Sequence, residues 1–169
     1  MGNPLVLCYH AVSERWPASL SVTPEAFEGQ LRFLSRSGFK GETFERAVSR
    51  GSDGRTVAIT FDDAYESVFE LARPILDDLG FPATVFVPTD YPARPGTPMA
   101  WDGIDRWIDG PYERELRPMS WEQLGVLAEA GWEIGSHTCS HPRLPSLGDE
   151  LLRRELFESR SMVAERLGR

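Results

Sequence analysis

Three histidines and one pair of adjacent aspartates are the side chains best suited to chemistry in this sequence. His137 and His141 are four residues apart, Asp62 and Asp63 are neighbours, and His10 is the remaining histidine. Two imidazoles and one carboxylate form a three-ligand site for Zn²⁺ or another divalent metal, with a position left for water. Such a metal lowers the pKa of its water, and a second carboxylate nearby can accept the proton. Adjacent side chains on extended backbone point in different directions, so one aspartate can bind metal while the other faces substrate.

Each of these signals has a simpler explanation when it is taken alone. An Asp-Asp pair after a strand is often a turn or a helix N-cap, and the H-x-x-x-H spacing fixes less geometry in a loop than on a helix. His10 fits a wall of the site and a structural hydrogen-bonding residue equally well. Cys139 lies between the two later histidines, where a loop filler is the simpler interpretation than a ligand. The occurrence of both motifs directly after strands favours a site.

Apolar runs precede these residues and predict the strands that position them. Short runs alternate with amphipathic stretches, which is typical of βα units around a parallel sheet. The carboxyl ends of parallel strands meet at one face, so the polar residues after them should meet there too. The predicted strands are Leu5 to Tyr9, Thr56 to Phe61, Ala83 to Val87 and Trp132 to Ser136.

Helices are predicted between and after these strands. Thr23 and Ser120 are predicted N-caps, the latter in a capping box with Gln123, and Ser146 is expected to cap the final helix. Pro74 should kink or split the helix that contains it. The predicted helices span 24–37, with an apolar face of Phe27, Leu31 and Leu34, then 43–49, 66–79, 120–131 and 149–167, and a polar turn is predicted at 51–55.

The segment 88–118 is rich in proline and glycine and is predicted to be a long irregular excursion with a short helix over 101–108. It contains Tyr91, Trp101 and Trp107, whose rings could stack on a sugar. Aromatic side chains are more often part of the core. Trp101 is retained as a substrate-binding candidate, together with His10.

Composition excludes some functions. The chain has 169 residues, enough for one domain, and a formal net charge of -8, which argues against nucleic acid as a partner. No apolar run approaches a membrane span. Two cysteines are too few for a disulfide framework, so free thiols are expected. The absence of a signal peptide predicts a cytoplasmic protein, or a secreted or cell-envelope one if a leader has been removed.

Three motifs resemble the polysaccharide deacetylase family, carbohydrate esterase family 4, with its NodB-type homology domain. They are YHAV at 9–12, TFDD at 60–63 and SHTCSHPRL at 136–144. The resemblance implies an α/β fold, a partial or distorted (β/α) barrel, and hydrolysis of N-acetyl groups on N-acetylglucosamine units. It also implies Asp62 as general base, and Asp63, His137 and His141 as ligands of a divalent metal, usually Zn²⁺.

The sequence departs from the family pattern in two respects. Ala64 stands where many members have glycine, and the later motifs, including the Leu-x-His motif that supplies the general acid, are missing. We therefore expect residues 1–169 to be the N-terminal portion of such a domain. A non-sugar amide or imide as substrate, and a non-catalytic metal-binding domain, remain alternatives. If the chain truly ends at Arg169, an exposed sheet edge predicts a homo-oligomer.

Overall fold

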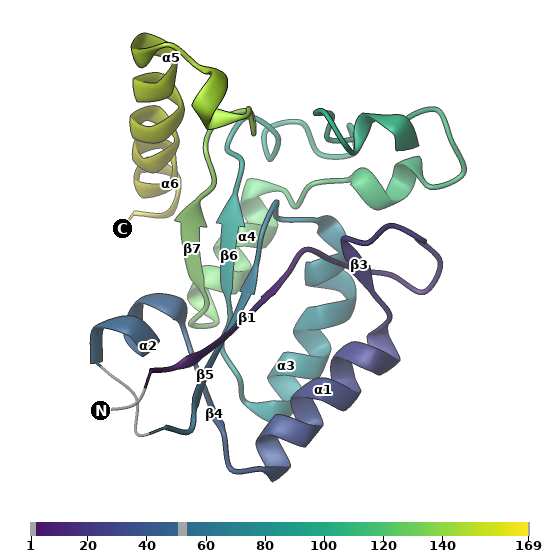
Figure 1. Ribbon diagram of the computed structural model, residues 1–169, viewed down its shortest axis with the longest axis vertical. Helices are drawn as coiled ribbons and strands as arrows, with labels where there is room; N and C mark the ends of the chain where they lie inside the picture. The colour runs from purple at the N-terminus through teal and green to yellow at the C-terminus, as the bar shows by residue number, and fades with distance from the viewer. Residues whose placement is uncertain (1–2, 51–53, 169) are drawn as a thin grey trace.

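A curved parallel sheet organises the chain, and the computed structural model describes residues 3–50 and 54–168 (Figure 1). Its strand order is β1 (Leu5–Tyr9), β5 (Thr56–Phe61), β6 (Thr84–Val87) and β7 (Glu133–Ser136). β4 (Lys40–Glu42) pairs with the first half of β5, and β6 pairs with the second half. Because β1 occupies one edge of β5, β4 and β6 share the other edge at different heights. The result is an open portion of a (β/α) barrel.

The strands that surround the candidate residues are confirmed. β1 and β5 have the predicted bounds, and β5 is buried along five of its six residues, as its β-branched composition indicates. The predictions missed β4 and the small ribbon of β2 (Ala11–Val12) and β3 (Ser21–Val22). These strands have two or three residues, too short for any periodicity to appear.

The first helices follow the capping chemistry of the sequence. α1 (Pro24–Arg36) begins after Thr23, whose hydroxyl accepts a hydrogen bond of 3.2 Å from the Ala26 amide, and it buries the predicted apolar face. α2 (Phe44–Arg50) matches the second predicted helix within a residue or two. The predicted turn at 51–55 lies partly outside the described residues.

Pro74 splits the next helix, as expected. A π-helical turn, Val68–Ala72, leads into α3 (Arg73–Leu79), which ends at Gly80 with φ +64°. Proline has no amide hydrogen to donate to the preceding turn, so the regular hydrogen-bond ladder changes there. α1 and α3 lie side by side against the sheet (Figure 1).

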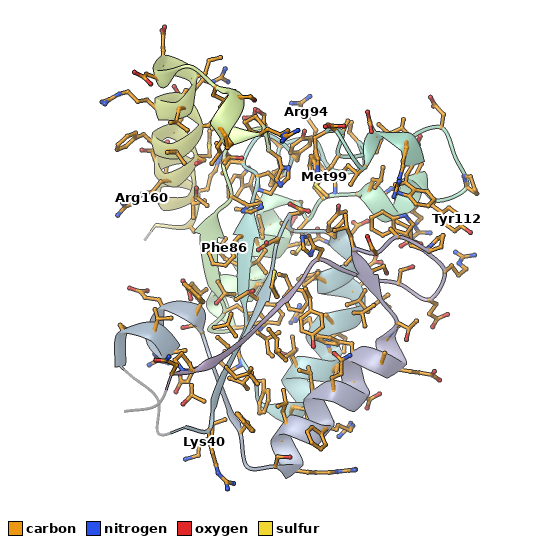
Figure 2. The ribbon with its side chains drawn as sticks, in the orientation of Figure 1. Lys40, Phe86, Arg94, Met99, Tyr112 and Arg160 are labelled. Atoms are coloured by element: carbon orange, nitrogen blue, oxygen red, sulfur yellow. The ribbon has the colours of Figure 1, made fainter. Side chains whose placement is uncertain are left out.

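The excursion 88–118 covers the carboxyl ends of the strands, and Arg94, Met99 and Tyr112 mark it in Figure 2. The helix predicted over 101–108 is wrong in extent, because only a 3₁₀ turn at Asp105–Trp107 forms, followed by another at Glu113–Leu116. Gly103, with φ +109°, is incompatible with a helix at that point. The capping box of Ser120 and Gln123 is present and begins α4 (Trp121–Glu129).

The last helix covers the predicted residues but is interrupted by a π-helical turn. It consists of α5 (Asp149–Arg153), a π-helical turn at Arg154–Glu158, and α6 (Ser159–Leu167). The predicted cap by Ser146 is wrong: this hydroxyl donates to the Arg143 carbonyl at 2.7 Å within a 3₁₀ turn, Leu144–Ser146. Gly148 occupies the N-cap position instead, without a side-chain hydrogen bond.

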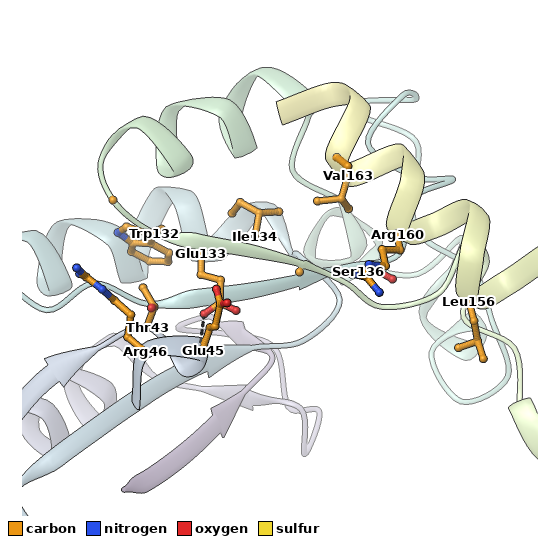
Figure 3. Close-up of a pocket in the computed structure, with 13 residues that line it drawn as sticks. Thr43, Glu45, Arg46, Trp132, Glu133, Ile134, Ser136, Leu156, Arg160 and Val163 are labelled. Carbon is orange, nitrogen blue, oxygen red and sulfur yellow. Dashed lines mark hydrogen bonds between the residues drawn. The ribbon is translucent and has the colours of Figure 1, made fainter. Parts of the chain in front are cut away.

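The core lies between the sheet and its helices, while one side of the sheet is open. Phe61 stacks on Trp132 with ring centroids 6.1 Å apart, at the centre of the core. Leu5 and Val6 on β1 are exposed at 37% and 40%. A hollow of about 770 Å³ lies beside β7, bordered by α2 and α6 (Figure 3). Within the described ranges, no helix is both long and apolar enough to cross a membrane.

Candidate metal centre

The carboxyl ends of β5 and β7 bring the predicted ligands together. Asp63 follows β5, and His137 follows β7, although β6 lies between these strands. The Asp62 amide donates to the Tyr9 carbonyl at 2.9 Å, and the His137 amide donates to the Val87 carbonyl at 2.9 Å. Both motifs are therefore attached to neighbouring strands where the loops begin. The segments that follow β5 and β7 therefore converge as expected.

One carboxylate oxygen of Asp63 faces both histidine rings. Its Oδ1 lies 3.5 Å from Nε2 of His137 and 3.3 Å from Nε2 of His141. Yet this oxygen is buried and has no hydrogen-bond partner among the described residues. Ligands placed tetrahedrally around Zn²⁺ at ordinary bond lengths are roughly 3.3–3.5 Å apart. The three donor atoms, all within 4.8 Å of one another, thus fit a small cation better than they fit hydrogen bonds.

The electrostatics of the three residues also suit a cation. Asp63 is only 3% exposed, and burial, with a contribution from the Asp62 charge, raises its pKa to about 7. Burial lowers the pKa of both His137 and His141, so both imidazoles are neutral at pH 7 and keep a lone pair. A positive ion between them would offset the unfavourable burial of the carboxylate.

Asp62 lies beside this cluster and is more exposed than Asp63. Its Oδ2 accepts a weak hydrogen bond of 3.5 Å from the thiol of Cys8 on β1. His10 follows the same strand, and burial lowers its pKa while the Asp62 charge opposes that change. Sequence reasoning did not anticipate Cys8 here. In the sheet, Cys8 pairs with Thr60, two residues before Asp62. The sequence alone does not give this pairing, because it depends on the register between β1 and β5.

A hollow of about 280 Å³ opens in front of the cluster. Trp101 lines it, and its ring centroid is 4.3 Å from that of His141, so the indole packs directly on a candidate ligand. Tyr91 contacts Trp101 edge-on. The hollow is lined, among others, by His10, Leu20, Asp63, Trp101, Arg106, Trp107 and His141. Leu20 and Arg106 had no distinguishing signal in the sequence.

Left-handed backbone shapes both ligand loops. Asp63 and Ala64 have φ of +69° and +55°, and Thr138 and His141 have φ of +70° and +59°. These conformations are uncommon for residues other than glycine and persist where surrounding contacts hold them. Ala64 is fully buried and adopts this conformation without the backbone freedom of glycine, the residue that the family resemblance implies here. Its Cβ therefore adds some backbone strain to the loop.

Cys139 is not one of the clustered donors. Its side chain is 3% exposed, and its thiol lies 3.8 Å from the Arg154 carbonyl of the final helix. Both Cys8 and Cys139 are free thiols. The interpretation of Cys139 as a residue that fills the loop agrees with this placement.

The chain is a βα protein with a parallel sheet. Two imidazoles and one carboxylate meet at the carboxyl ends of its strands and form a candidate metal centre. The family model described as polysaccharide deacetylase matches residues 49–169, well over half of the chain. The chain belongs to the polysaccharide deacetylase family.

Individual relatives share about a quarter of their aligned residues with this chain. YxkH of Bacillus subtilis (strain 168) is 26% identical over 162 residues, which cover 93% of this chain and 50% of that protein. Poly-beta-1,6-N-acetyl-D-glucosamine N-deacetylase of Staphylococcus epidermidis is 26% identical over 155 residues, covering 80% and 48%. The chain thus spans about half the length of the curated relatives it matches.

The fold is shared with a solved deacetylase. The Streptococcus pyogenes deacetylase PplD, in complex with acetate, superposes with a TM-score of 0.76 at 23% identity, covering 98% of this chain and 70% of that one. This likeness confirms the α/β fold with its partial (β/α) barrel.

Proposed function

We propose that this chain contributes the metal centre of a deacetylase that removes N-acetyl groups from a polysaccharide containing N-acetylglucosamine. The observation that carries the proposal is the approach of Asp63 Oδ1 to two imidazole nitrogens at 3.3 and 3.5 Å without hydrogen bonding. Family membership and a relative named for poly-beta-1,6-N-acetylglucosamine support the choice of substrate class.

Asp63, His137 and His141 would hold a divalent metal ion, most simply Zn²⁺, because two nitrogen donors and one oxygen donor match its preference. When bound, such an ion supplies a Lewis acid for the acetyl carbonyl and lowers the pKa of the attacking water. The carboxylate of Asp62 would accept the proton of that water, as it lies next to the ligand without belonging to the donor cluster.

The hollow in front of the cluster would receive the acetylated sugar. Trp101 and His10 line it and would contact the sugar ring or the acetyl group. Since one face of the Trp101 indole packs on His141, its edge and outer face are what it can offer to a substrate. Half-buried walls of this kind exclude bulk water from the acetyl carbonyl.

Metal analysis and acetate release test the proposal together. Purified protein should bind about one Zn²⁺ per chain, and Asp63→Ala should lose it. Acetate release should then be measured from poly-β-1,6-N-acetylglucosamine, chitin oligosaccharides, peptidoglycan and small amides. Asp62→Asn should keep the metal and lose turnover, while Asp78→Asn, which changes an exposed carboxylate paired with Arg32, should alter neither.

Each result has a distinct meaning. Metal binding without acetate release from any of these compounds would favour a metal-binding domain without turnover. Release from small amides alone would move the substrate class away from sugars. Loss of metal in Asp62→Asn would contradict the roles assigned to the two aspartates.

A further inference from the structure

The loop that carries both candidate histidines needs external support. Thr138 and His141 both have left-handed backbone. From one side, the segment after β6 supports this loop: the Thr89 amide donates to the Thr138 carbonyl at 3.1 Å, and the Asp90 amide to the Cys139 carbonyl at 2.9 Å. These bonds use the carbonyls of the loop and leave its amide hydrogens to be satisfied elsewhere.

Glu155, on the π-helical turn of the final helix, accepts two of those amide hydrogens, and the His141 amide donates to the Thr138 hydroxyl. Its Oε2 accepts from the Cys139 amide at 2.7 Å and the Ser140 amide at 2.9 Å, and its Oε1 accepts from the Ser140 hydroxyl at 2.8 Å. Glu155 is 6% exposed, and within the described ranges it forms no ion pair. A buried carboxylate without an ion pair is rare unless several donors satisfy it.

The hydrogen bonds to Glu155 together affect its pKa more than its burial does. Burial alone would raise the pKa of Glu155, but the donations from Ser140 and Cys139, together with the charge of Arg154, lower it below the ordinary value. The side chain is therefore ionised at neutral pH and accepts strong, charge-assisted hydrogen bonds. The carboxylate and the loop thus form one rigid unit at the centre of the H-x-x-x-H motif.

Ser159, the first residue of α6 and the next after this turn, contacts the residue before His137. The hydroxyls of Ser159 and Ser136 are 2.7 Å apart, and Ser159 donates to the Glu155 carbonyl at 2.6 Å. With its own hydrogen used there, Ser159 accepts from Ser136, which directly precedes His137. π-Helical turns are uncommon and are often found at functional sites. Here the turn and the first residue of α6 together hold the histidine loop and the residue before it.

We infer that Glu155 is a positioning residue for the candidate metal centre: it fixes the 138–141 loop so that His137 and His141 face Asp63. This inference rests on the proposed function, because it assigns a role toward the same metal. Residues that orient ligands from behind typically change metal affinity by about 10–100-fold when they are removed.

Zn²⁺ titration against a chromophoric chelator tests this role without any need for turnover. Glu155→Ala should bind Zn²⁺ about 10–100-fold more weakly than the wild type. Glu155→Gln should remain within a few-fold, because its amide oxygen can accept both loop amides and its amide nitrogen can donate to Ser140. The matched control is Glu158→Ala on the same turn. The exposed Glu158 carboxylate pairs with Arg154, and its removal should leave the Zn²⁺ affinity unchanged.

Cobalt absorption separates positioning from simple stabilisation. With Co²⁺ in place of Zn²⁺, Glu155→Ala should alter the visible absorption bands that report ligand geometry, whereas a loss of helix docking alone would lower the melting temperature and leave them intact. If Glu155→Ala does not fold, Glu155→Asp replaces it, because the shorter side chain withdraws the acceptor from the loop.

The outcomes are distinguishable. Wild-type protein that binds Zn²⁺, together with a folded Glu155→Ala or Glu155→Asp that binds equally well, overturns this inference and leaves the proposed function intact. Equal losses in Glu155→Ala and Glu158→Ala would also overturn it. Wild-type protein that takes up no Zn²⁺ overturns the metal centre itself, and the role of Glu155 with it.

Discussion

In metal-free protein, replacing Asp63 with asparagine is expected to stabilise the fold above pH 7, although it removes a proposed ligand. The carboxyl group is 3% exposed and has a folded-state pKa of about 7, against an ordinary value of 3.8. Well below its ordinary pKa of 3.8 the group is protonated in both states. As the pH rises to 7, the unfolded state ionises freely while the folded state holds its proton, so stability is progressively lost.

The size of this effect follows from the two pKa values. The difference between about 7 and 3.8 corresponds, at about 1.36 kcal/mol per pH unit, to about 4 kcal/mol. In a chain of 169 residues, this corresponds to a melting-temperature difference of roughly 10 °C. The asparagine side chain of the Asp63→Asn variant would be neutral at every pH and close to the protonated carboxyl in shape. The variant should therefore match the wild type near pH 4 and exceed it at pH 8.

Urea and thermal unfolding in the presence of a chelator, from pH 4 to pH 8, measure this difference. Asp78→Asn, which removes an exposed carboxylate, controls for the change in net charge and should show no comparable gap. Adding Zn²⁺ should reverse the order at pH 8, because only the wild type gains binding free energy. A stability difference between wild type and Asp63→Asn that does not vary with pH would show that folded Asp63 does not retain its proton up to about pH 7.

Four further outcomes are expected. Zn²⁺ affinity should fall about tenfold per pH unit below pH 7 and level off above it, because Asp63 must lose its proton to bind; calorimetry across this range would show whether affinity instead stays constant. Ser120→Ala should lower the free energy of unfolding by about 1 kcal/mol in urea titration, because it breaks the capping box of α4. Gly135→Ala should lower it by about 1–3 kcal/mol, because a Cβ there would lie 2.6 Å from the Phe86 ring. Gly125→Ala, where a Cβ meets no neighbour, should instead raise it by up to about 1 kcal/mol, and equal effects of the two glycine variants would contradict this.

The strands and the capped helices were predictable because their signals are local. The β-branched run of β5 and the Thr23 cap of α1 depend on side chains within a few positions of one another. The Ser146 cap failed for the opposite reason. Its hydroxyl has an alternative acceptor in the Arg143 carbonyl, and only the turn before α5 decides between the two.

The candidate ligands were predictable from their types and their places after strands, yet their mutual distances were not. Whether Asp63 reaches His137 and His141 depends on β6 lying between β5 and β7 and on left-handed backbone at four non-glycine positions in the two ligand loops. The role of Glu155 had no local signal at all. It is one acidic residue in a helix rich in charges, and only tertiary packing shows that it is buried on the histidine loop.

The available chemistry follows from the order of the residues, because two imidazoles and two carboxylates placed after apolar runs can be read before any folding is considered. The tertiary structure decided which oxygen faces the imidazoles, which carboxylate is buried enough for its pKa to rise to about 7, and what holds the histidine loop in place. Those properties depend on distances of a few ångströms between segments far apart in the chain, and such distances exist only once the sheet and its helices have packed.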